Sequence, residues 1–253
     1  MKRTAVPSLL ALAALLLAAC VGTTTVVTVS EQPESLAPSY LRGFTLISDA
    51  EEPAIGRILR YDGALIGSAV LISPTHVLTA SHVVDDGEAY WFESNGTKYC
   101  INQVHLHPLN KIAGRYVIDV ALLVLSEPCP EQPVCLGSGA LLRGEPLTAI
   151  GHGGGLRKRS DPGVLWYYGT LIEDPFNLKM LCYEGTVWFG DSGGAVLDFQ
   201  GKLVGIISSL GGRRGYIYEN SAVRVDLLLP WITDIMEDNE CNSPALNGFL
   251  FAP

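Results

Sequence analysis

The sequence is poor in charged residues, and the charges it has are unbalanced. Only 17% of the 253 residues are charged, and the net charge at neutral pH is −9. Hydrophobic residues make up 48% of the chain, which excludes a disordered protein and fits a globular one. The acidic balance argues against a nucleic-acid partner, because proteins that bind nucleic acids usually present a basic face.

Repeats, long apolar runs and clusters of metal ligands are missing too. No segment recurs at a fixed period, and the apolar run from Leu9 to Ala19 is too short for a membrane-spanning helix. His105 and His107 have the spacing of two ligands on one strand face, but zinc needs further ligands and none is evident. We therefore expect neither a metal site nor a cofactor.

From Ile55 onward, short apolar runs alternate with turn signals, and no helical period occurs before residue 226. This pattern predicts an all-β sandwich or barrel. Strands are expected at residues 64–72, 89–92, 120–125, 147–150, 164–171 and 203–209. Turns are expected at residues 62–63, 85–87, 95–96 and 161–163.

One stretch, Gly190-Asp191-Ser192-Gly193-Gly194, places a hydroxyl among glycines that leave backbone N–H groups exposed. A serine needs a base to become a nucleophile at neutral pH. The stretch also fits the nucleophile elbow of the α/β-hydrolases, and His152 begins a run that fits their oxyanion-hole motif. Those enzymes place their histidine after the serine, however, and no histidine follows Ser192. A serine esterase therefore remains the weaker alternative.

The order His82, Asp119, Ser192 is the order of a different class of enzyme. The segments that carry these residues, LTASH, IDVALL and GDSGG, resemble the signature segments of the trypsin/chymotrypsin-like serine proteases. The resemblance implies two six-stranded antiparallel β-barrels and a short C-terminal helix. It divides the peptidase domain, residues 54–238, into barrel one (54–144), barrel two (145–225) and the helix (226–238), followed by a tail (239–253).

The resemblance also implies a catalytic triad and a substrate cleft. His82 would act as the base, Asp119 would orient it, Ser192 would be the nucleophile, and the N–H groups of Gly190 and Ser192 would form the oxyanion hole. Substrate would be bound by Thr186, Phe189, Ser208, Ser209 and Leu210, with Ser208 also bonded to Asp119. Thr186 replaces the aspartate of trypsin-like enzymes, so we expect a neutral, small or medium side chain in the pocket rather than Arg or Lys.

Activation is left open by the sequence. In this family a freshly cut N-terminus usually pairs with the aspartate before the nucleophile, here Asp191, but a matching start is only faintly visible at residues 40–43. Three interpretations follow: an unusual cut there, an internal partner for Asp191, or a poorly formed oxyanion hole. The last would make the chain a catalytically silent homologue that acts as a binding module.

The N-terminus has the features of an export signal. Lys2 and Arg3 precede the apolar run, and Leu17-Ala18-Ala19-Cys20 resembles the lipobox of bacterial lipoproteins. Residues 1–19 would then be removed and Cys20 lipidated; an ordinary cleavage site and a buried helix are the alternatives. Residues 20–53 would tether an extracytoplasmic domain to the membrane. By the bacterial sorting rule Val21 favours the outer membrane or cell surface of a Gram-negative host.

The cysteine content is compatible with an exported protein, but it does not determine which cysteines would form disulfides. Plausible pairs are Cys129 with Cys135, or one of these with Cys241, while Cys100 and Cys182 could pair only if their strands meet. The expected partners are a protein or peptide substrate and the membrane, and we expect a monomer.

Overall fold

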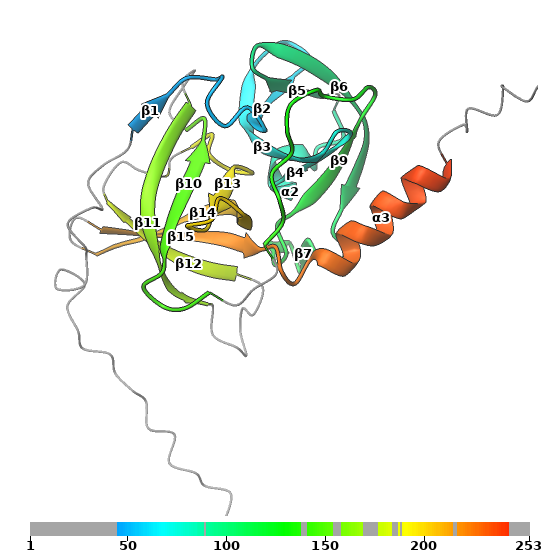
Figure 1. Ribbon diagram of the computed structural model, residues 1–253. Helices are drawn as coiled ribbons and strands as arrows, with labels where there is room; N and C mark the ends of the chain where they lie inside the picture. The colour runs from blue at the N-terminus through cyan, green and yellow to red at the C-terminus, as the bar shows by residue number, and fades with distance from the viewer. Residues whose placement is uncertain are drawn as a thin grey trace, which may run out of the picture. The chain divides into compact units, whose positions relative to one another are not determined.

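The computed structural model describes residues 45–88, 90–137, 141–153, 158–168, 177–183, 187, 189–214 and 217–242. Cys20 and the residues proposed as signal and lipobox lie outside these ranges, as does Thr186. Strands dominate the described residues, and their helices are the short α2 and the C-terminal α3 (Figure 1). None of the helices within these ranges is long and apolar enough to cross a membrane.

Barrel one is a closed antiparallel barrel with the strand order β2-β3-β4-β9-β6-β5. Its strands are β2 (Ile55–Arg60), β3 (Leu65–Ser73), β4 (His76–Thr79), β5 (Tyr90–Ser94), β6 (Thr97–Leu106) and β9 (Ala121–Leu125). The β5–β6 hairpin turns at Asn95 and Gly96, with φ of 46° and 80°. Two positive φ values are those of a type I′ turn, which confirms the turn expected there.

Barrel two is built on a sheet with the order β1-β11-β10-β13-β14-β15-β12. Its strands are β1 (Thr45–Ile47), β10 (Pro146–Gly151), β11 (Lys158–Tyr168), β12 (Asn177–Tyr183), β13 (Ala195–Leu197), β14 (Leu203–Arg214) and β15 (Ile217–Arg224). Because β12 pairs with both β15 and β11, six of these strands close into a ring, and β1 is added outside it at β11. The predicted pair of six-stranded barrels is thus confirmed.

The turn expected at residues 161–163 is wrong, because these residues lie inside β11. Pro162 pairs with Thr148 of β10 on one side. On its other side, the pairing with β1 ends at Ser160 and that with β12 begins at Gly163. A proline has no N–H to give to a ladder, so a strand tolerates it where one neighbour is missing.

Apolar side chains form three cores. The interior of barrel one and the interior of barrel two each hold one, and a third lies between the barrels. Strand β9 contributes side chains to two of these cores. Leu123 faces the interior of barrel one, whereas Leu122 and Val124 face the core between the barrels. This is why its apolar run is continuous rather than alternating. The two barrels are therefore held against each other by a packed apolar core.

The C-terminal helix α3 spans Leu229–Asn242, so it begins three residues after the expected start and continues past residue 238. Pro230 lies in its first turn, where a missing N–H removes no helical hydrogen bond. Ile232 is buried in the core between the barrels, and Trp231 packs edge-on against His107 with ring centroids 5.1 Å apart. The helix thereby packs against the core between the barrels.

Within the described ranges, Cys100, Cys129 and Cys135 are free thiols. The expected pair of Cys129 with Cys135 is therefore not formed in the structure. Nothing is described for the side chains of Cys182 and Cys241.

Phe92 is fully buried in barrel one, where its ring lies 6.4 Å from that of Tyr99. We expect Phe92→Ala to lower the free energy of unfolding by about 3–5 kcal/mol, because it leaves a cavity in a packed core. Phe199, which is 69% exposed, provides the matched control, and Phe199→Ala should change stability little. Denaturant unfolding measures both; equal losses would contradict the assigned core.

Candidate active site

The candidate base, His82, lies on the helical turn α2 (Ser81–Val84), directly after β4. Its Nδ1 is 2.7 Å from Asp119 Oδ2, and its backbone N–H donates to Asp119 Oδ1 over 3.0 Å. The two residues are brought together because β4 pairs with β9, with Thr79 opposite Ala121. Since an ionised carboxylate only accepts hydrogen bonds, Nδ1 carries the proton and Nε2 is the basic nitrogen.

Asp119 is only 4% exposed, and its carboxylate accepts hydrogen bonds from both barrels. Ser81 Oγ donates to Oδ1, and Ser208 Oγ of β14 donates to Oδ2, each over 2.7 Å. The second contact is the one that the family resemblance implied. Burial by itself raises the pKa of Asp119, but the hydrogen bond and charge of His82, with the bonds from Ser208 and Ser81, outweigh it and hold the pKa below its ordinary value.

Ser192 lies in the turn that leads into β13, and this turn touches barrel one closely. A Cβ on Gly193, where φ is +85°, would lie 2.1 Å from both Ser68 O and Thr79 Oγ1. Only glycine fits such a position. Gly190, one of the two predicted oxyanion donors, has φ of +100°, which again favours glycine.

Ser68, on β3, holds this turn in place and was missed by the sequence analysis. Its N–H donates to Ser192 O over 2.8 Å, and its Oγ donates to Gly190 O over 2.7 Å. The same Oγ accepts the N–H of His152 over 2.9 Å. A single serine after a glycine gives no signal for this role, because its partners come from barrel two.

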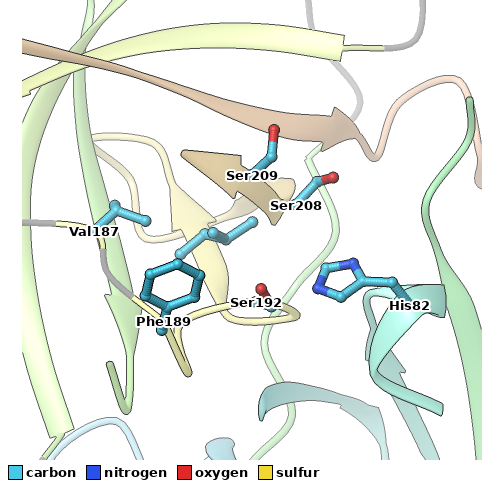
Figure 2. A pocket seen from close by; sticks show the side chains of 7 residues that line it. His82, Val187, Phe189, Ser192, Ser208 and Ser209 are labelled. Carbon is cyan, nitrogen blue, oxygen red and sulfur yellow. The ribbon is translucent and has the colours of Figure 1, made fainter. Parts of the chain in front are cut away.

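A cavity of about 430 Å³ opens beside Ser192. Figure 2 shows Ser192 and the His82 ring at its edge, with one ring nitrogen of His82 on the side of Ser192. The cavity is lined by His82, Val187, Phe189, Ser192, Ile207, Ser208 and Ser209. Three of the expected substrate-binding residues, Phe189, Ser208 and Ser209, thus lie on one cavity. For Leu210 the structure describes the backbone in β14, and Thr186 lies outside the described ranges.

Asp191, whose partner was left open, is 1% exposed and accepts the N–H of Gly153 at its Oδ1 over 2.5 Å. The described part of the chain thus supplies an internal partner for this carboxylate. Residues 40–43, where the alternative cut was considered, lie outside that part.

The hairpin of β7 (Lys111–Ile112) and β8 (Arg115–Tyr116) lies beside His82. The sequence analysis did not predict this contact. The Tyr116 ring packs edge-on against the His82 ring, with centroids 5.7 Å apart. Tyr116 OH donates to Asp85 Oδ2 over 2.5 Å, and Lys111 pairs with the same carboxylate. Asp85 follows α2 directly, so this cluster ties the hairpin to the turn that carries His82.

The lowered pKa of Asp119 predicts a pH dependence of stability. Its ionised form is favoured in the folded state, so the stabilisation is complete above its ordinary pKa of 3.8 and is lost as the pH falls through the lower folded value. We expect Asp119→Asn to flatten the stability profile in this acidic range. Urea unfolding of both proteins from pH 6 downward measures it, and parallel profiles would contradict the prediction.

Comparison with known proteins gives the family. The model of the trypsin-like peptidase domain matches residues 67–206, more than half of the chain. The periplasmic serine endoprotease DegP of Salmonella typhimurium is 28% identical over 152 residues, 57% of this chain and 30% of that protein. The periplasmic pH-dependent serine endoprotease DegQ of Escherichia coli is 24% identical over 152 residues. The chain thus spans less than a third of the length of these relatives.

Two solved structures share the fold, each at 18% identity. Neuropsin, a serine protease of mouse brain, matches with a TM-score of 0.66. The match covers 98% of the neuropsin chain and 76% of this one. The protease VesB of Vibrio cholerae has a TM-score of 0.64, with 67% of its chain and 77% of this one covered. With the family model matching more than half of the chain, this protein belongs to the trypsin-like peptidase family.

Proposed function

We propose that the protein is a serine endopeptidase that uses His82, Asp119 and Ser192 as its catalytic triad. The observation that carries the proposal is the buried Asp119 carboxylate bonded to His82 Nδ1, with Ser192 on the same cavity. This arrangement leaves the basic nitrogen of His82 on the side of the hydroxyl. The relatives are named as serine endoproteases, which supports the same chemistry.

In the proposed mechanism, His82 Nε2 takes the proton of Ser192 Oγ as the oxygen attacks a peptide carbonyl carbon. The imidazolium then gives its proton to the leaving amine, which leaves an acyl-enzyme, and water attacks this ester by the same route. Asp119 keeps the ring in the required tautomer and stabilises its charge. The N–H groups of Gly190 and Ser192 bind the oxyanion, each worth about 2.7–4 kcal/mol in such enzymes.

The two alternative functions, a serine esterase and a catalytically silent homologue, are not equally compatible with the fold. A serine esterase of the α/β-hydrolase type is excluded, because the described chain forms paired β-barrels. A silent homologue shares the fold and differs only in whether Ser192 is activated. The hydrogen-bonded pair of His82 and Asp119 and the internal partner of Asp191 favour activity.

We further propose that the protein works outside the cytoplasm, anchored by a lipid on Cys20. The lipobox-like sequence supports the anchor, and the relatives named as periplasmic support the compartment. Residues 21–40 would then act as a tether that lets the cleft reach protein or peptide substrates away from the bilayer.

We expect the mature protein to be labelled by a fluorophosphonate probe, which reacts only with an activated serine. Ser192→Ala should remove the labelling completely, and His82→Ala should lower turnover of a protein substrate by several orders of magnitude, because the base is lost. Ser209→Ala, on the same cavity, is the control and should stay labelled. A folded wild-type protein that is not labelled would favour the silent homologue.

The anchor has a separate test. Cys20→Ser should release the protein from the membrane fraction into the soluble extracytoplasmic fraction, since the acceptor of the lipid is removed. Cell fractionation with Cys100→Ser as the matched control measures this. Retention of Cys20→Ser in the membrane would disprove the lipid anchor and leave the proposed catalysis untouched.

A further inference from the structure

Asn220 is a buried amide with no hydrogen-bond partner. It lies on β15 and is 3% exposed, and neither its Nδ2 nor its Oδ1 is hydrogen-bonded to any part of the chain that the structure describes. Leaving such a group unpaired costs free energy, so folded proteins rarely keep one without a use. A ligand that supplies both missing partners would recover this cost.

The strand register places Asn220 on the face of β15 that points into the interior of barrel two, where the cavity-lining Ile207 and Val187 also pack. Ala222, two residues further along β15, lies on the same face and pairs with Ile207 of β14. Ala222, Ile207 and Val187 pack in one apolar cluster, and the last two of these line the cavity. Asn220 pairs with Leu210, the next residue of β14 after the cavity-lining Ser209.

The chemistry of this pocket selects one kind of side chain. Apart from His82 at its catalytic edge, the lining residues and Asn220 carry no ionisable charge, so a buried Lys, Arg, Asp or Glu side chain would lack a counter-ion among them. An aliphatic side chain would leave both atoms of the amide unpaired. A primary carboxamide matches it, because its NH₂ donates to Asn220 Oδ1 while its oxygen accepts from Nδ2.

We propose that Asn220 is a specificity-determining residue, which makes the enzyme cleave after glutamine or asparagine. The inference rests on the proposed endopeptidase function and sharpens the expected neutral preference into a class of substrate. Asn220 acts by binding the side chain before the scissile bond and takes no part in the chemistry at Ser192.

The test is a digest of a peptide library, with cleavage sites read by mass spectrometry and rates measured on matched peptides. The wild-type enzyme should cleave after Gln or Asn at least about tenfold faster than after Leu. Asn220→Leu, which keeps the volume, should reverse this ratio, and Asn220→Asp should gain cleavage after Lys and Arg because it adds a carboxylate. Asn102→Leu, the same change at an exposed position of β6 in barrel one, is the control and should keep the wild-type profile.

Fluorophosphonate labelling separates the two levels of the proposal. All these variants should be labelled like the wild type, because the probe does not need the pocket; absence of labelling in the folded wild type refutes the endopeptidase itself. With labelling intact, a preference for aliphatic or basic residues, or an unchanged Gln preference in Asn220→Leu, overturns the role of Asn220. Thermal unfolding adds a check: Asn220→Leu should not lower the melting temperature, whereas a clear loss would show a structural role.

Discussion

Four hydrogen bonds to one buried carboxylate, that of Asp119, hold the candidate site together. They come from the side chain and backbone of His82, from Ser81 beside it, and from Ser208 on the other barrel. An ionised carboxylate is expensive to bury, and only a full set of donors makes the burial tolerable. The charge therefore favours one arrangement of both barrels, the one in which all four donors are present.

The nucleophile turn is held differently, by its close approach to barrel one and by hydrogen bonds from Ser68. Gly193 lets the turn come so close to barrel one that a side chain would not fit, and Ser68 then bonds to the carbonyls on either side of the turn. Together with the hydrogen bonds to Asp119, these contacts mean that the candidate site forms only where the two barrels meet.

The sequence was enough to predict the fold class, the order of the candidate triad and the contact of Ser208 with Asp119. The all-β class follows from the alternation of short apolar runs and turns, whereas the contact of Ser208 was implied by the resemblance of short motifs to the protease family. It failed at Pro162, because whether a proline ends a strand depends on which neighbours flank it. It also missed the roles of Ser68 and Tyr116. The partners of these residues are set by strand register and by the docking of distant segments, which no local pattern records.

The distribution of the site over the two barrels has a consequence for the protein as it is synthesised. Synthesis delivers barrel one first, with the proposed base and acid but without the nucleophile. Ser192, and Ser208 that completes the shell of Asp119, arrive only with the last strands. Under the proposed mechanism, a chain that is still being synthesised or translocated has no assembled active site. Under the proposed export, the export machinery would therefore meet a protease that has not yet acquired its reactive group.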